Sequence, residues 1–197
     1  DIKDHQLLQD NLSQRSGHKV QIKYRVRKNR LRWLQMARTN AEHGLALQAA
    51  SDATIRRQFK ALGEVLGFEE TPQRLECFDV SHTSGEATVA SCVVFNTTGP
   101  LKSDYRRFNL KSVSAGDDYA AIAEALRRRY VRVKKSEVPM PDLLLVDGGK
   151  GQLSEALTVL EELELDWLQV VAIAKGKSRK IGKEQLFLAG MSMPTIL

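Results

Sequence analysis

Residues Leu75–Phe95 read LECFDVSHTSGEATVASCVVF, and this stretch decides the fold. Apolar and β-branched residues on both sides of Ser84-Gly85-Glu86 predict two strands joined by a turn. One carboxylate, Asp79, falls inside the first strand, where an ionised group without a partner is costly to bury. An arginine, a metal ion or a functional role would each explain it. A hydrogen-bonded structural aspartate near the strand end would explain it too.

The composition is that of a globular protein with one good core and an appendage. The chain has 197 residues, a formal net charge of +6 and a pI near 9.4. It contains neither a long apolar run nor an opening signal-peptide pattern, so we expect a soluble, cytoplasmic protein without a membrane partner. Cys77 and Cys92 lack metal-ligand spacing, which fits buried thiols in a reducing compartment. The positive charge suits a polyanionic partner or simply a solubilising surface.

Residues 1–70 are predicted to form a mainly helical N-terminal segment, followed by a domain over residues 71–197. Apolar residues recur at helical spacing from Leu31 to Leu45 and again from Ile55 to Leu66, which predicts one long helix or two stacked helices. The pattern begins within the basic run KYRVRKNRLR, residues 23–32. These cations fit a solvated helix face as well as a phosphate contact.

The domain continues with alternating strands and helices. Residues 105–110, YRRFNL, predict a third antiparallel strand, and a helix follows from Gly116-Asp117-Asp118, where one aspartate is a natural N-cap. Residues 142–147 and 169–174 read as buried strands on either side of another helix, and residues 186–188 as a last strand. We therefore predict an α/β fold: a mixed sheet of five to six strands flanked by helices.

A functional site is expected where the parallel strands end. Asp147 ends the fourth strand, and Asp79 lies beside it if the first and fourth strands are neighbours. Carboxylates so placed would hold Mg²⁺ or Mn²⁺ through oxygen atoms, with Asp118 supplying a third oxygen directly or through water. This donor set predicts metal-dependent phosphodiester hydrolysis.

The segment after the fourth strand reads Asp147-Gly148-Gly149-Lys150-Gly151. Its glycines let the backbone approach a phosphate, and Lys150 is placed to contact it. The segment lacks the spacing and the Lys-Ser/Thr pair of a Walker loop, so binding of a nucleotide triphosphate is not expected. Ser81-His82 beside Asp79 suggests a catalytic triad, but no strained nucleophile turn is visible, which favours a supporting histidine in the turn.

Several motifs in a fixed order resemble the C-terminal half of the bacterial UvrC family, the component of the UvrABC excinuclease that incises DNA in nucleotide excision repair. WLQMARTNA from Trp33 resembles the preceding helix of that family. The resemblance covers nearly the whole chain and is specific. The remaining motifs are FDVSHTSGEATVASCVVF from Phe78, YRRFNL from Tyr105, GDDYAAI from Gly116, LRRRY from Leu126, PDLLLVDGGKGQL from Pro141 and AIAKG from Ala172.

The resemblance implies an RNase H-like endonuclease domain that makes the 5′ incision at damaged DNA. Asp79 and Asp147 would be catalytic metal ligands, and Asp118 a further catalytic acid. The implied partners are DNA and, in a full-length protein, the UvrB component of the excinuclease on damaged DNA. The basic residues expected to contact DNA are Lys150, Arg106, Arg107, Arg127, Arg128, Arg129 and Lys175. For Arg127, Arg128 and Arg129, which crowd the end of a predicted helix, a favourable interaction with the helix dipole is a sufficient explanation as well.

The C-terminal residues depart from the pattern of the family. The resemblance implies a catalytic histidine beyond the last strand, whereas this sequence ends in GMSMPTIL and has no histidine after His82. We therefore expect a C-terminally incomplete domain. The alternative is a catalytically impaired RNase H-like module that binds DNA or a repair partner without cutting.

Overall fold

The structure is a computed structural model that describes residues 4–23, 25–83, 87–110, 113–114, 116–175, 184–190 and 195–196. Contacts divide the chain into two units, residues 1–51 and residues 52–197. Helix α1 spans His5–Ser16, and helix α2 spans Asn29–Leu66 without interruption. The two apolar stretches of the N-terminal segment therefore belong to one helix.

The segment after α1 folds back along that helix. Gly17 ends α1 in the left-handed conformation, with φ 70°, and its N–H donates to the Ser13 carbonyl at 3.1 Å. The Ser13 hydroxyl accepts from the Val20 N–H at 2.9 Å, and Gln9 Oε1 accepts from the Ile22 N–H at 3.0 Å. Side chains of α1 thus satisfy backbone groups that have no helix or sheet partner.

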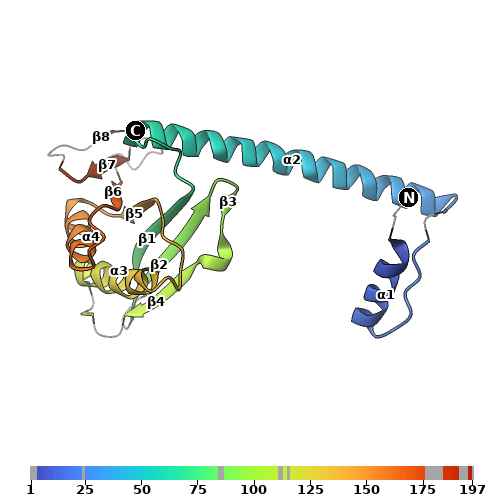
Figure 1. The fold of residues 1–197 in the computed structure, drawn as a ribbon, viewed down its shortest axis with the longest axis horizontal. Helices are drawn as coiled ribbons and strands as arrows, with labels where there is room; N and C mark the ends of the chain where they lie inside the picture. Colours follow the sequence, from blue (N-terminus) through green and yellow to red (C-terminus); the bar gives the residue numbers. More distant parts are fainter. Residues whose placement is uncertain are drawn as a thin grey trace. The chain divides into compact units, whose positions relative to one another are not determined.

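The second unit is built on one mixed sheet (Figure 1) with the strand order β3-β2-β1-β5-β6-β7-β8, in which β4 also pairs with β2. Strands β1, β2 and β4 are antiparallel, whereas β1, β5 and β6 are parallel. The strand bounds are β1 Arg74–Thr83, β2 Ala87–Asn96, β3 Gly99–Pro100, β4 Arg106–Leu110, β5 Leu143–Asp147, β6 Gln169–Ala174, β7 Gln185–Leu188 and β8 Thr195–Ile196, and a short 3₁₀ turn, η1, spans Lys102–Asp104.

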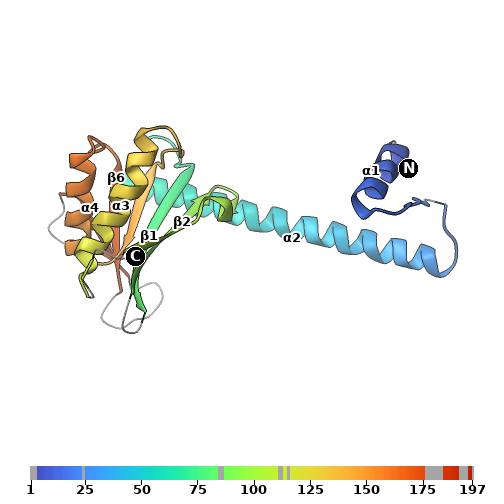
Figure 2. The same ribbon diagram turned by 90° about the horizontal axis from the view of Figure 1, so that it is seen from below.

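Helices α3 (Asp118–Lys134) and α4 (Lys150–Glu162) cover one face of this sheet (Figure 2). The main core lies between them and the sheet, and it includes Phe78, Leu126 and Leu160. A smaller cluster on the opposite face joins Phe59 and Leu66 of α2 to strand residues such as Leu143. Because side chains alternate along a strand, β1 sends Phe78 and Val80 to the first face and Leu75 to the second.

The topology confirms the predicted mixed sheet and the adjacency on which the site depends. Strand β1 pairs with β5 in parallel, with Phe78 opposite Val146. The two-residue strands β3 and β8 were not predicted, because so short a strand leaves no alternating pattern. The predicted turn at Ser84-Gly85-Glu86 lies outside the described residues. Within the part of the chain that the structure describes, no helix is both long enough and apolar enough to span a membrane.

Candidate nuclease site

Asp79 and Asp147 lie side by side on neighbouring parallel strands. Their strand neighbours Phe78 and Val146 are directly paired, so each aspartate is one position further along its strand. Asp147 is the last residue of β5, and 40% of its side chain is exposed. The two carboxyl groups therefore lie together at a solvent-accessible edge of the sheet, as the sequence predicted.

The two carboxyl groups interact electrostatically. Burial and the negative charge of Asp147 raise the pKa of Asp79, and a hydrogen bond between the two side chains adds to this effect. Lys175, which follows β6 directly, opposes it, and its Nζ lies 4.0 Å from Asp147 Oδ2. One proton or one cation would relieve the repulsion between these carboxylates.

Cys77, which the sequence predicted only as a buried thiol, lies close to this pair. It precedes Asp79 by two residues on β1, which places both side chains on one face of the strand. Burial chiefly, and then the charges of Asp147 and Asp79, raise the pKa of its thiol to about 11. Cys77 is therefore an uncharged neighbour of the carboxylates. The two-residue spacing in the sequence was the signal for it.

Close packing holds the glycine-rich segment after β5. Gln152 Oε1 accepts a hydrogen bond from the Gly149 N–H at 3.0 Å, which caps the start of α4. A Cβ atom on Gly151 would overlap the far end of the Tyr119 ring, so a larger residue at this position would displace that half-exposed ring. Lys150 extends over the Phe187 ring, with Nζ 5.9 Å from the ring centre. The segment thus joins the first turns of α3 and α4 at the edge that carries Asp147.

Asp117 and Asp118 share the start of α3 but differ in position and role. Asp117 is the N-cap, and its side chain accepts a hydrogen bond from the Ala120 N–H at 2.9 Å. Asp118 is the first residue of the helix. No group of three or more His, Cys, Asp or Glu side chains in the described residues is close enough to hold a metal ion. The structure therefore does not place Asp118 as a direct ligand beside Asp79 and Asp147.

The pair alone has the donor chemistry of a site for a hard divalent cation. Two accessible carboxyl groups that repel each other supply oxygen ligands and leave room for water, the arrangement in which Mg²⁺ usually binds. Asp79 and Asp147 are the residues that would hold it. The side chain of His82 lies outside the described residues.

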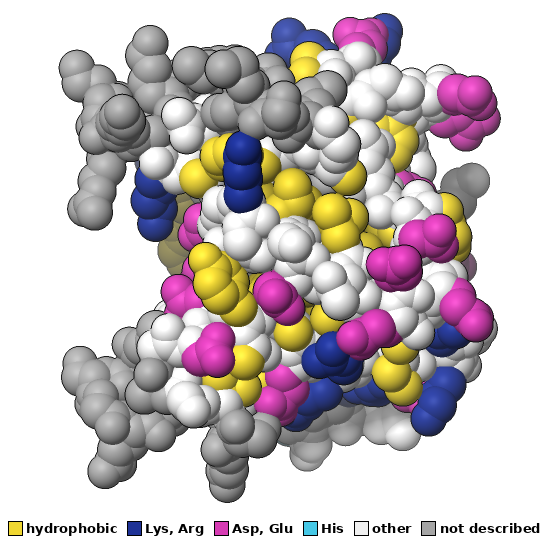
Figure 3. Space-filling model, turned by 90° about the vertical axis from the view of Figure 1, so that its left-hand side faces the viewer, with side chains coloured by type: hydrophobic (Ala, Val, Ile, Leu, Met, Phe, Trp, Pro, Cys, Tyr) yellow, Lys and Arg dark blue, Asp and Glu magenta, His cyan; other side chains and the backbone are white. Residues whose placement is uncertain are grey.

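Most of the basic residues predicted to contact DNA are exposed. Arg106 donates from Nη1 to the Ser103 and Tyr105 carbonyls at 2.9 and 2.7 Å, and Arg107 is exposed on the same strand. Arg127 pairs with Glu162 at 2.8 Å. Figure 3, which faces the left side of Figure 1, shows side chains of both charges interspersed with apolar groups.

Arg128 and Lys150 are exposed as well, although each packs against an aromatic ring. Arg128 Cζ lies 5.5 Å from the centre of the Phe108 ring, and its Nη1 lies 3.6 Å from a Glu124 oxygen. Lys175 is also exposed, at 75% of its side chain. These three cations remain candidates for phosphate contacts.

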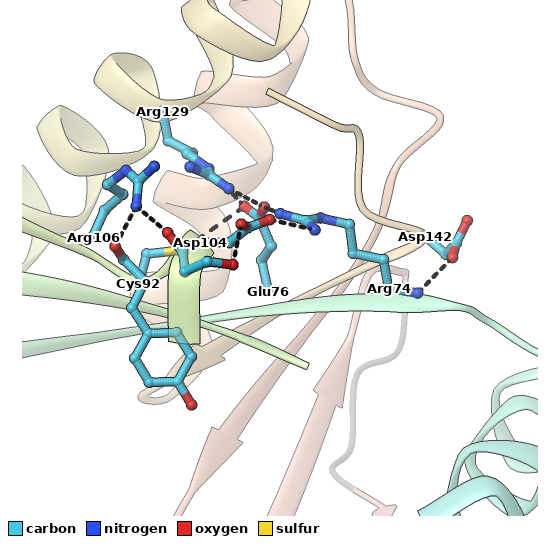
Figure 4. A network of polar contacts seen from close by, with 9 residues as sticks. Arg74, Glu76, Cys92, Asp104, Arg106, Arg129 and Asp142 are labelled. Carbon is cyan, nitrogen blue, oxygen red and sulfur yellow. Dashed lines mark hydrogen bonds and ion pairs between the residues drawn. The ribbon is translucent and has the colours of Figure 1, made fainter. Parts of the chain in front are cut away.

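The prediction for Arg129 is wrong. Its side chain is only 2% exposed and donates to Glu76, from Nε to Oε2 at 3.1 Å and from Nη2 to Oε1 at 2.5 Å. Arg74 approaches the same carboxylate at 3.2 Å and bonds Asp104 at 2.8 Å, as Figure 4 shows. Arg129 therefore neutralises a buried acid in β1 and is not available to DNA.

Two family models and many curated relatives match this chain. The model described as the UvrC RNase H endonuclease domain matches residues 63–197, and the one described as the UvrC ribonuclease H-like domain matches residues 1–48. The UvrABC system protein C of Alkalilimnicola ehrlichii is 53% identical over 188 residues, which is 95% of this chain and 31% of the relative. That of Pseudomonas putida is 57% identical over 172 residues, covering 87% of this chain and 28% of the relative.

The chain thus spans about a third of the length of these relatives. Among solved structures, an endonuclease V from Ciona intestinalis in complex with DNA is 18% identical, covers 68% of this chain and 59% of its own, and has a TM-score of 0.41. Human endonuclease V is 21% identical, covers 66% of this chain and 59% of its own, and has a TM-score of 0.39. The family model matches well over half of the sequence and includes every strand of the sheet, so this chain belongs to the UvrC RNase H endonuclease domain family.

Proposed function

We propose that this chain is the divalent-metal-dependent endonuclease domain that makes the 5′ incision at damaged DNA in nucleotide excision repair. The observation that carries the proposal is the pair Asp79 and Asp147, brought together by the parallel pairing of β1 and β5. The raised pKa of Asp79 supports it, because burial and then the charge of Asp147 disfavour its ionised form, which a bound cation would favour.

Asp79 and Asp147 would hold Mg²⁺ or Mn²⁺ in this proposal. The cation would supply the positive charge that stabilises the phosphate during phosphodiester hydrolysis. The protein groups contribute position, because both carboxylates extend from strands of one rigid sheet rather than from loops. Asp118 is proposed as a further acid that acts from the start of α3 without touching the cation.

Phosphate binding is assigned to the cations near this edge. Lys175 lies 4.0 Å from Asp147, and Lys150 opens α4, where the positive end of the helix dipole also attracts anions. Arg106, Arg107, Arg127 and Arg128 are exposed cations on β4 and α3 and are proposed to contact the DNA backbone further from the cut.

The partners follow from the family rather than from the site. The relatives are named as components of a UvrABC system, and this chain corresponds to about a third of their length. We propose that in such a full-length protein the domain acts on damaged DNA together with the UvrB component of the excinuclease. No group in the described residues suggests that this domain reads the lesion.

The proposal is tested by calorimetric titration of Mn²⁺ into the purified chain, followed by a nicking assay on nicked and bubble DNA. We expect binding in the wild type and none in Asp79→Ala or Asp147→Ala, while both variants keep the circular dichroism spectrum of the wild type. Asp166→Ala, which removes an exposed aspartate elsewhere, is the matched control. Metal-dependent nicking that persists in either site variant would exclude this carboxylate pair as the nuclease centre.

A further inference from the structure

A second concentration of charge lies in the first unit, in residues that the nuclease site does not use. Residues 11–41 contain nine Lys and Arg and no Asp or Glu. Five of these cations, Lys23, Arg25, Arg27, Lys28 and Arg30, line a single surface hollow of about 460 Å³. We call these five residues the basic hollow. All five are exposed, and none has an ion-pair partner among the described residues.

The helix that follows makes this charge still less favourable. The basic hollow adjoins the N-terminus of α2, and the first turn of α2 contains no acidic residue. A helix N-terminus carries a partial positive charge, so cations at that end are repelled, whereas acids are the usual occupants. Arg30 and Arg32 therefore lie at the end of a 38-residue helix where the helix dipole repels cations. A bound anion would offset this electrostatic repulsion.

The backbone at the same point is also unusual. Lys28 has a φ of 53°, one of the few positive values at a residue other than glycine. Its carbonyl accepts from the N–H groups of Leu31 and Arg32 at 3.1 and 3.3 Å, which starts α2. A lysine held in the left-handed region adds local backbone strain at a residue that lines the hollow. Charge repulsion and backbone strain thus coincide in one short segment.

An exposed aromatic side chain identifies the kind of anion. Trp33 is 63% exposed and lies three residues after Arg30, so the two share one face of α2. A cluster of cations beside an exposed ring is the combination that binds single-stranded nucleic acid, in which phosphates meet the cations and a base stacks on the ring. A free phosphate or a lipid headgroup would use the cations alone.

We infer that the basic hollow and Trp33 form a second DNA-binding site, which holds the phosphate backbone of a single strand without reading its sequence. This site belongs to residues 1–51 and does not depend on the carboxylates of the nuclease site. It goes beyond the proposed incision, because it assigns nucleic-acid affinity to a unit that contains none of the proposed catalytic residues.

The test compares two triple variants of the whole chain that lose the same charge. Arg25→Gln, Arg27→Gln and Arg30→Gln together remove three of the five cations of the basic hollow, whereas Arg38→Gln, Arg56→Gln and Arg57→Gln remove exposed cations elsewhere on α2. Affinity for a thymidine oligonucleotide is measured by fluorescence anisotropy at several salt concentrations. Each phosphate contact contributes about 0.7 to the salt slope for single strands, so we expect the slope to fall by about 2 in the first variant. In the second variant it should scarcely change.

Trp33 provides an independent readout. The sequence contains two tryptophans, so in a Trp167→Phe background Trp33 is the sole source of tryptophan fluorescence. The oligonucleotide should quench this fluorescence, and the hollow variant should lose the quenching at the same concentration. Circular dichroism on both triple variants confirms that the helices remain. Equal loss of slope in both triples, or quenching that survives removal of the hollow, would overturn the site.

Two further measurements distinguish this DNA-binding site from the nuclease site and from a site for lipid headgroups. Asp79→Ala and Asp147→Ala should keep the full salt slope. A failure of the nuclease proposal can therefore be distinguished from a failure of the binding site, because each set of variants tests only one of them. Vesicles of phosphatidylglycerol supply phosphate headgroups without bases. Sedimentation with vesicles that requires the hollow, without a matching effect on the oligonucleotide, would assign the site to a membrane surface and contradict the inference.

Discussion

Arg129 of α3 and Glu76 of β1 form a bidentate ion pair in which 2% of one side chain and none of the other is exposed. Glu76 lies three residues before Asp79 on the same strand, and the pair is enclosed beside the main core. The Cys92 thiol lies 3.8 Å from Glu76 Oε2, and the hydroxyl of Tyr130 is buried without a hydrogen-bond partner in the described residues. A charged connection therefore joins α3 to the strand that presents one half of the nuclease site.

Removing one partner of this pair should destabilise the fold. Arg129→Ala leaves the Glu76 carboxylate buried, which we expect to cost about 3–5 kcal/mol in the free energy of unfolding. Arg74, at 3.2 Å from the same carboxylate, keeps one contact and favours the lower part of that range. Urea unfolding followed by near-ultraviolet circular dichroism measures the difference.

The neighbouring arginine is the natural control for that experiment. Arg127 and Glu162 are 47% and 46% exposed, so Arg127→Ala should cost no more than about 1 kcal/mol. If Arg129→Ala cost as little free energy of unfolding as Arg127→Ala, the buried pair of Arg129 and Glu76 would not be a source of stability.

Asp79→Asn should stabilise the metal-free chain at neutral pH. Burial and the charge of Asp147 raise the pKa of Asp79 in the folded chain. The folded state therefore gains stability from the protonated Asp79 at low pH, and it loses this stability as the pH rises through the raised pKa. Calorimetry in the presence of a chelator should therefore give a higher Tm for Asp79→Asn at pH 7. Below about pH 3, where an ordinary aspartate is also protonated, the difference should vanish.

The exposed Asp166→Asn substitution tests whether that gain is specific to the pair. It changes the net charge equally without touching Asp147, and we expect its Tm to follow the wild type at both pH values. A rise in Tm that is the same at low and neutral pH for Asp79→Asn would mean that repulsion between the carboxylates is not its source.

Cys77 should react slowly with alkylating agents in the folded chain. A thiol pKa of about 11 leaves few thiolates at pH 8, whereas an unfolded cysteine has a pKa of about 8.5. Iodoacetamide should modify Cys77 on the order of a hundredfold more slowly in the folded than in the unfolded chain. Tandem mass spectrometry distinguishes it from Cys92. A rate in the folded chain that is already constant above about pH 9 would contradict the raised pKa.

Gly151→Ala should disturb the edge that carries Asp147. Alanine normally favours a helix over glycine by roughly 1 kcal/mol, but here its Cβ would overlap the Tyr119 ring. We expect displacement of this half-exposed ring to outweigh that gain, with a net loss of about 1 kcal/mol in stability and weaker Mn²⁺ binding. Adding Tyr119→Ala should restore both quantities. A stabilising effect of Gly151→Ala alone would show that Tyr119 moves aside freely.

The order of strands and helices could be predicted because it depends on local patterns. The apolar residues of Leu75–Phe95 and of residues 142–147 alternate or run together as strands require, and helical spacing marks α2, α3 and α4. Asp79 and Asp147 could be paired from the sequence because parallel strands end at one edge, so their meeting needed only the adjacency of β1 and β5.

The three arginines of Leu126–Tyr130 show where local pattern fails. Arg127 and Arg128 are exposed, while Arg129 turns inward beside Tyr130 on the same helix. Arg129 follows Leu126 by three residues, which places both side chains on the face of α3 that packs against the sheet. Glu76, an acid between apolar strand residues, was the matching signal on β1. The prediction considered only Asp79 as a carboxylate of that strand and therefore missed Glu76.

The sequence by itself determined helices α2, α3 and α4, the longer strands, the alternation that assigns residues to each face of the sheet, and the two aspartates at its edge, because each follows from neighbours within a few residues. Only the tertiary structure decided which charges are buried. Glu76 and Arg129 are 53 residues apart in the chain, and their pairing depends on how α3 packs across β1. A charge is tolerated in a core only when a distant partner meets it there, so burial of Arg129 is a property of the packed fold.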